Sequence, residues 1–230
     1  IKTKNLFIKK KIIIFKGIKF HNLTFDQINR RLHNHGGLLV APAASALSRI
    51  DIDKEYYNSL KKSNIAILDS GFFCILLRIF KGLSVSRLSG YLFLKKFLDF
   101  NFDKKIKFFL IEPSERDAKI NKSYLLKKKI NKIESYTAPK YNFGKFNDLR
   151  LLKKIKKNKP RFIIVNIGGG IQENLGLYIK THINFKCSII CTGAAIAFLT
   201  KRQAPINDLI DKLYLGWLMR TLYDPKKFFF

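Results

Sequence analysis

Acidic residues, cysteines and long apolar runs are all scarce in this sequence, and each scarcity excludes a class of protein. The cysteines Cys74, Cys187 and Cys191 form no C-x-x-C pair and have no neighbouring histidine, so neither zinc nor a disulfide framework is expected. Buried thiols in a reducing compartment are the simpler interpretation. No apolar run approaches the roughly 18–20 residues of a spanning helix, and the basic start lacks the features of a signal peptide. We expect a cytoplasmic protein, or one bound to a membrane surface without crossing it.

The shortage of acidic residues leaves a strong positive charge. Against 16 Asp and Glu the chain has 45 Lys and Arg, for a formal net charge of +29. Such a field attracts nucleic acid, anionic lipid or phosphorylated small molecules. No nucleic-acid-binding module or basic–aromatic stacking pattern is present, so no specific nucleic-acid partner is expected. A solvated lysine surface that reflects AT-rich coding is the alternative explanation.

Short apolar runs alternate with helical segments along most of the chain. Strands are expected at residues 11–20, 38–40, 65–68, 107–111, 162–165 and 186–191, with a further short one near 133–136. Helices about ten or more residues long between strands are typical of βαβ units. The sequence therefore predicts an α/β domain over residues 1–200, with a mostly parallel sheet covered by helices on both faces. Residues 201–230 are expected to form a C-terminal appendage.

Residues 161–173, RFIIVNIGGGIQE, are the stretch around which the rest is organised. An apolar run ends at Gly168, Gly169 and Gly170, and a helical segment begins at Glu173. Glycines allow a ligand to approach the backbone, and a helix N-terminus favours an anion. The pattern predicts a nucleotide or phosphate site at the carboxyl end of the sheet, with a tight turn in a packed core as the alternative.

A carboxylate follows another buried strand. Asp69 comes directly after residues 65–68 and before Gly71, where open α/β sheets place their sites. The alternative is that Asp69 only caps the helix expected at residues 72–80. Arg87 begins a basic turn farther along the chain, and Gly193 lies in a small-residue loop after the strand at 186–191.

The C-terminal appendage combines basic and aromatic residues. A helix is expected at residues 209–222, with Trp217 and Arg220 at helical spacing, and Lys226 and Lys227 precede a final run of phenylalanines. Basic residues beside exposed aromatic rings suit an anionic membrane surface. A helix docked on the domain, with a frayed tail, is the alternative.

In their order these segments resemble the WecG/TagA/CpsF family of bacterial glycosyltransferases. The matching stretches are residues 20–28, LLVAPA at 38–43, SNIAILDSGFFCILLRIFKG at 63–82, RLSG at 87–90, GGGIQE at 168–173, residues 193–205 with 213–220, and DPK at 224–226. The resemblance implies a Rossmann-like fold. It also implies inverting transfer of an N-acetylmannosamine-type sugar from a UDP donor to a polyprenyl-diphosphate-linked sugar, in surface polysaccharide synthesis at the inner face of the plasma membrane. No metal or other cofactor is implied, and a homo-oligomer is left open.

The resemblance also assigns roles to the matching residues. Asp69 takes the place of the general base, and Arg87 that of a diphosphate-binding or orienting residue. The substrate-binding positions would be Gln172, Glu173, Gly168, Gly169, Gly193, Ala41 and Ala43. The positions that would meet the diphosphate and the membrane are Arg202, Arg220, Lys226, Lys227 and Trp217.

Several family positions are replaced in this chain. Alanines stand at Ala41 and Ala43, where the family has Thr and Asn, and Glu112-Pro113 stands where it has a glycine-rich turn. Further replacements are Ser70, Leu92, Gly170, Ile171, Ala197 and Gly216. Each lost hydrogen bond to substrate costs on the order of 1–3 kcal/mol. A diverged, weak or inactive member that binds a lipid-linked glycan or a partner enzyme is therefore the alternative function.

Overall fold

The computed structural model describes residues 8, 10–100, 102, 105–141 and 146–203. The strands are β1 (Ile12–Phe15), β2 (Ile18–His21), β3 (Gly37–Val40), β4 (Ile65–Ile67), β5 (Lys107–Glu112), β6 (Lys132–Thr137), β7 (Phe162–Val165) and β8 (Ser188–Cys191). The helices are α1 (Phe25–His35), α2 (Ala44–Leu47), α3 (Lys54–Lys61), α4 (Gly71–Lys81), α5 (Gly90–Leu98), α6 (Glu115–Lys127), α7 (Leu149–Asn158), α8 (Ile171–His182) and α9 (Ala195–Leu199).

The strands form one 8-stranded sheet in the order β1-β2-β4-β3-β8-β7-β5-β6. All neighbours pair in parallel except β1 and β2, which form an antiparallel hairpin. The single strand expected at residues 11–20 is thus two strands. The chain reverses at Lys16 and Gly17, which both have positive φ, 46° and 76°, as a two-residue hairpin turn requires.

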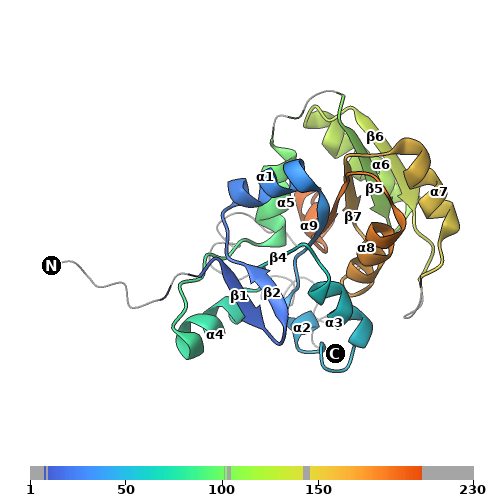
Figure 1. The fold of residues 1–230 in the computed structure, drawn as a ribbon. Helices are drawn as coiled ribbons and strands as arrows, with labels where there is room; N and C mark the ends of the chain where they lie inside the picture. The colour runs from blue at the N-terminus through green and yellow to red at the C-terminus, as the bar shows by residue number, and fades with distance from the viewer. Residues whose placement is uncertain (1–7, 9, 101, 103–104, 142–145, 204–230) are drawn as a thin grey trace.

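Helices cover both faces of the sheet, which confirms the predicted α/β class (Figure 1). Side chains alternate between the two faces along each strand: in β3, Leu38 and Val40 enter one core and Leu39 the other. The first core is closed by α2, α3, α4, α7 and α8, and the second by α1, α5, α6 and α9. In the part of the chain that the structure describes, no helix is long and apolar enough to cross a membrane.

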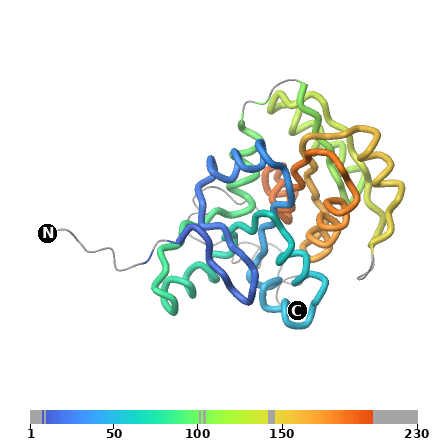
Figure 2. The backbone as a smooth tube through the Cα atoms, in the orientation of Figure 1, coloured from blue at the N-terminus to red at the C-terminus, as the bar shows by residue number. Residues whose placement is uncertain are grey.

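The two halves of the chain meet at the pairing of β3 with β8. Strands β1 to β4 lie on one side of this pairing and β5 to β8 on the other, and the blue and yellow parts of the tube in Figure 2 lie correspondingly apart. From this pairing the sheet continues through β4 in one direction and through β7 in the other. In open α/β sheets, ligands bind at such a switch point, outside the carboxyl ends of the strands. A ligand site is therefore expected among the loops that follow β3, β4, β7 and β8.

Candidate functional site

Asp69 follows β4 at this edge of the sheet and lies between two helix N-termini. Its carboxylate Oδ1 accepts a hydrogen bond of 2.7 Å from the backbone N–H of Gly90, the first residue of α5. It does not cap α4, because Ser70 does so through its bond to the N–H of Phe73. The positive end of a helix dipole stabilises a carboxylate there. Asp69 therefore contacts the start of α5, whereas Ser70 caps the helix that follows Asp69 in the sequence.

Arg87 lies directly beside Asp69. Its Nε donates to the backbone carbonyl oxygen of Asp69 over 2.7 Å. The next residue, Leu88, continues the pairing through its N–H to the carbonyl oxygen of Leu68, at 3.2 Å. The turn that carries Arg87 is thus fixed against the end of β4. The carboxylate and the guanidinium predicted to share a site are neighbours in the fold.

Gln172 and Glu173 lie in the first turn of α8, and both side chains are buried. The Gln172 amide accepts from the N–H of Gly193 at 3.1 Å and donates to Glu173 Oε1 at 2.9 Å. The other Glu173 oxygen accepts from the N–H of Gly170 at 2.7 Å. These bonds fasten the glycine loop after β7 to the loop after β8, so the two side chains hold the loops in place.

The glycine loop itself faces open space. Gly168 and Gly169 are exposed, and a Cβ added at either would meet nothing within 4 Å. Gly170 has a φ of 89°, which L side chains rarely adopt. The loop therefore offers its backbone to the surroundings directly before the N-terminus of α8, as an anion site needs.

Contacts join the Asp69 side of the edge to the Gln172 side. A Cβ placed on Gly90 would lie 3.0 Å from the carbonyl oxygen of Thr192 and 3.2 Å from Cβ of Ala41. The start of α5, which binds Asp69, therefore packs against the ends of β3 and β8. Thr192 precedes Gly193, the partner of Gln172. The edge thus brings together residues that lie far apart in the sequence.

Burial and neighbouring charge raise the pKa of one carboxyl group at this edge. The pKa of Glu173 is raised to about 7, mainly because it is buried and in lesser part by the charge of Asp69, although bonds from Gln172 and Gly170 oppose the rise. Burial, followed by the charges of Glu173 and Asp69, also raises the pKa of the Tyr56 hydroxyl. The charge of Asp69 thus disfavours ionisation of the Glu173 carboxyl group.

Tyr56 was not identified from the sequence. It lies in α3 with its side chain 2% exposed, and its hydroxyl has no hydrogen-bond partner among the described residues. The spacing of Tyr56 and Leu60 predicts a buried helix face and nothing more. This buried hydroxyl is a polar group that the sequence pattern could not identify.

Glu112 was also missed as a polar centre. It ends β5 fully buried, and its two carboxylate oxygens accept from the side-chain amides of Asn121, at 2.9 Å, and Asn166, at 2.8 Å. Burial raises its pKa to about 7, against the lowering effect of these two bonds. Ser114 caps the helix that follows. The sequence feature that could have identified this polar centre is a glutamate at the end of an apolar strand.

Ala41 and Ala43 leave the loop after β3 without side-chain hydrogen bonds. Ala41 is 7% exposed. Ala43 occupies the N-cap of α2, a position favoured by Asn, Ser, Thr and Asp, and makes no side-chain cap bond. The backbone of this loop therefore carries no polar side chain at either position.

Of the predicted C-terminal residues, only Arg202 lies within the described ranges. Its guanidinium pairs with the carboxylate of Asp117 in α6. Ser114 also bonds that carboxylate, at 2.5 Å. Arg220, Trp217, Lys226 and Lys227 lie outside the described residues, so their predicted roles stay predictions.

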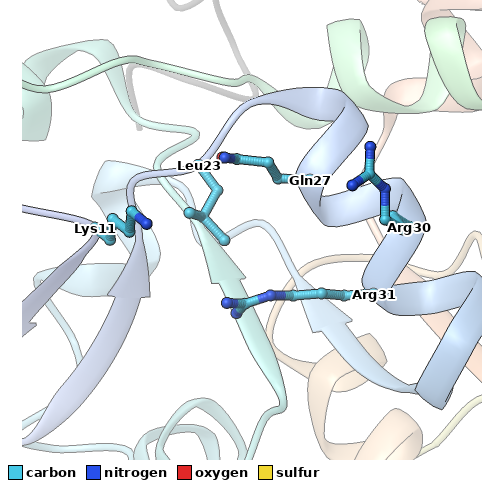
Figure 3. Close-up of a pocket in the computed structure, with 5 residues that line it drawn as sticks. All are labelled: Lys11, Leu23, Gln27, Arg30 and Arg31. Atoms are coloured by element: carbon cyan, nitrogen blue, oxygen red, sulfur yellow. The ribbon is translucent and has the colours of Figure 1, made fainter.

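A pocket of about 200 Å³ lies beside α1 and contains none of the predicted residues (Figure 3). It is lined by Lys11, Leu23, Gln27, Arg30 and Arg31. Its basic side chains do not converge, because Arg30 and Arg31 point in different directions from α1 (Figure 3). Over the described ranges, no group of three or more His, Cys, Asp or Glu could hold a metal ion.

Comparison with models of protein families places most of the chain in one family. The profile described as the glycosyl transferase WecG/TagA/CpsF family matches residues 13–230, nearly the whole chain. No curated protein matches the sequence.

Proposed function

The chain belongs to the WecG/TagA/CpsF family of glycosyltransferases, and we propose that it moves an N-acetylmannosamine-type sugar from a UDP donor to a polyprenyl-diphosphate-linked sugar. The reaction would invert the anomeric carbon and serve surface polysaccharide synthesis. It would need no cofactor beyond the donor. The family membership supports sugar transfer, and the motifs that surround Asp69, Arg87 and Gln172 support the finer assignment.

The observation that carries the proposal is the position of Asp69. It lies at the carboxyl end of β4, one strand from the switch point, with the N–H of Gly90 on one oxygen. In the proposed step the carboxylate takes the proton from an acceptor hydroxyl as the hydroxyl oxygen attacks the anomeric carbon. The bond from that carbon to the diphosphate oxygen breaks on the opposite side, and UDP leaves with its negative charge.

Positive groups near Asp69 suit the departing diphosphate. Arg87 is fixed beside Asp69, and arginine binds phosphate oxygens through charge-assisted hydrogen bonds. The open backbone of Gly168 and Gly169 precedes the N-terminus of α8, a second source of anion-stabilising N–H groups. Gln172 and Glu173 would keep this loop in register with Gly193.

The acceptor would reach the site from a membrane. A polyprenyl tail stays in the bilayer, so the enzyme would work on the cytoplasmic side at the anionic surface. Arg202, Arg220, Lys226 and Lys227 would contribute charge there, and Trp217 an aromatic anchor. The formal charge of +29 supports this orientation.

Release of UDP from UDP-N-acetylhexosamine donors, measured with a water-soluble lipid-diphosphate acceptor, tests the proposal. Asp69→Asn keeps the shape of the side chain but removes the base, so kcat should fall by about 100-fold or more. The matched control is Asp26→Asn, in the exposed first turn of α1, which should turn over like wild type. An Asp69→Asn enzyme as fast as wild type would exclude Asp69 as the base.

A second function is favoured by the loop after β3. Because Ala41 and Ala43 carry no polar side chains, the sugar pocket would have fewer partners for a donor. The chain would then bind a lipid-linked glycan or a partner enzyme without transfer. Calorimetric binding of UDP, combined with no transfer to any acceptor tested, would support this function over the first.

A further inference from the structure

Helix α4 presents apolar side chains on the face that points away from the core. Phe72 is 62% exposed, Ile75 40%, Ile79 69% and Phe80 75%. The sequence has no charged residue between Asp69 and Arg78. A surface helix normally carries polar residues on its outer face, and large exposed apolar patches mark interaction sites. The outer face of α4 therefore lacks the polar character of an ordinary solvated helix.

The inner face of α4 is already used in the core. Phe73 packs against Phe15 and Phe20, with ring centroids 5.0 and 5.2 Å apart, and Cys74 and Leu77 are buried beside it. Figure 1 shows α4 beside the β1–β2 hairpin at the edge of the sheet. The exposed residues lie on the opposite side of the helix, so packing within the described fold does not explain them.

Composition does not explain the apolar face either. Helix α7 buries Leu151, Leu152 and Ile155 on its inner face in the same way. Apart from Leu149, its exposed positions are all basic: Arg150, Lys153, Lys154, Lys156 and Lys157. The chain thus supplies lysines to outer helix faces elsewhere, and α4 is an exception within the same protein.

Exposed lysines lie at the C-terminal end of α4. Lys81 ends the helix, and the amide of Asn22 bonds the backbone carbonyl oxygens of both Lys10 and Ser84, each at 2.8 Å. Lys10 is therefore held close to the segment that follows α4, and both lysines are exposed. An apolar helix face with cations at its border has the chemistry of an interfacial membrane helix.

We propose that the outer face of α4 docks the protein on an anionic lipid bilayer, with Phe72, Ile75, Ile79 and Phe80 entering the interfacial layer. The positive charge of the chain favours anionic lipid over a second copy of the protein as the partner of this face. A second copy of a chain with a net charge of +29 would be repelled. Anionic lipid is attracted by the same charge while it accepts the apolar side chains.

The position of α4 connects this surface to the candidate site. The helix begins just after Asp69 and has 11 residues, a length of about 16 Å. Docking along α4 would thus bring the carboxyl edge of the sheet to the bilayer, where a polyprenyl-linked acceptor is held. This orientation rests on the proposed function, whereas the docking itself rests on the exposed face alone.

Co-sedimentation of the full chain with phosphatidylcholine vesicles, with and without phosphatidylglycerol, tests the docking. The Ile75→Gln/Ile79→Gln double variant should bind the anionic vesicles at least about tenfold more weakly than wild type. The matched control is Ile52→Gln/Leu149→Gln, which removes two exposed apolar side chains elsewhere and should bind like wild type. Equal binding by the α4 double variant would overturn the proposal.

A label gives a readout that does not depend on weakened binding. All native cysteines are buried, so an environment-sensitive dye can be placed on Ile79→Cys, with Leu149→Cys as the control. Anionic vesicles should shift the emission to the blue only for the dye at position 79. No shift there overturns the proposal, as does a shift caused by self-association in the absence of lipid, which would assign the face to a second copy.

Failure of docking and failure of the proposed function are distinguishable. Asp69→Asn should bind vesicles like wild type, because Asp69 is not on the outer face of α4. Transfer to a water-soluble acceptor without vesicles reports on the chemistry alone. Vesicle binding that depends on α4, together with absent transfer, would leave the docking surface standing and remove the transferase assignment.

Discussion

Gly193 donates its backbone N–H to Oε1 of Gln172 over 3.1 Å, and this bond joins the loop after β8 to the helix after β7. Gln172 also donates to Glu173, so its amide is used on both sides. The side chain is 1% exposed. The bond therefore controls how the two loops are placed relative to each other.

Gln172→Ala should lower both stability and turnover. The variant leaves the Gly193 N–H without its acceptor, at a cost of roughly 1–3 kcal/mol in the free energy of unfolding. Urea denaturation measures that loss. Because Gln172 positions the loops, kcat should fall more than KM rises. Unchanged kcat in a measurably destabilised variant would contradict the positioning role.

Glu112→Gln should alter how stability depends on pH. Burial raises the folded-state pKa of Glu112 from its ordinary value of 4.5 to about 7, so the folded protein binds more protons between these values than the unfolded chain. Stability from this group is present below pH 4.5 and is lost as pH rises through 7. The variant cannot titrate there, so between pH 5 and pH 8 its unfolding free energy should fall less than that of wild type, by roughly 1–3 kcal/mol.

Glu173 provides the comparison for that experiment. Its pKa is also raised to about 7. Glu173 therefore also lowers the unfolding free energy as pH rises, and that decrease persists in Glu112→Gln. The measurement is a series of urea denaturations across the pH range. A wild-type stability that rises between pH 5 and pH 7 in parallel with the variant would contradict the buried, raised-pKa state of Glu112.

Gly36→Ala should be strongly destabilising. Gly36 has a φ of 71°, and a Cβ there would lie 2.5 Å from the backbone oxygen of Cys187. The neighbouring residues form the β3–β8 pairing, in which Gly37 donates to that same oxygen at 2.7 Å. Strain and the clash together should lower the unfolding free energy by about 3 kcal/mol or more.

Gly82→Ala is the matched control for Gly36→Ala. Gly82 also has a positive φ, 57°, but a Cβ there meets nothing within 4 Å. Only the conformational cost of about 1 kcal/mol remains. Thermal or urea unfolding compares the stability of the two variants. Equal losses of unfolding free energy would show that a Cβ at position 36 does not clash with the backbone of Cys187.

Much of the fold could be predicted from the sequence because its signals are local. The buried strand before Gly168 and the capped start of α1 at Thr24 are both found in the structure. The Lys16-Gly17 turn was missed, since lysine at positive φ gives no sequence signal. A hairpin was therefore interpreted as one continuous strand.

The candidate site was predictable in position but not in its contacts. Asp69 follows a buried strand, so the rule for parallel sheets places it at the carboxyl edge. The bond from Gly193 to Gln172 depends on how β7 and β8 pair, and the packing of Gly90 on Ala41 depends on β3 lying beside β8. Such long-range pairing cannot be derived from local patterns, and Tyr56 and Glu112 were missed for the same reason.

The place of β8 between β3 and β7 has a consequence for synthesis of the chain on the ribosome. The facing edges of β3 and β7 stay unpaired until residues 188–191 have emerged, because β8 fills the gap between them. An unpaired strand edge recruits other chains, so the nascent protein is exposed to misassembly until β8 is available to pair. Pairing of β8 therefore joins two separate sets of strands into one continuous sheet.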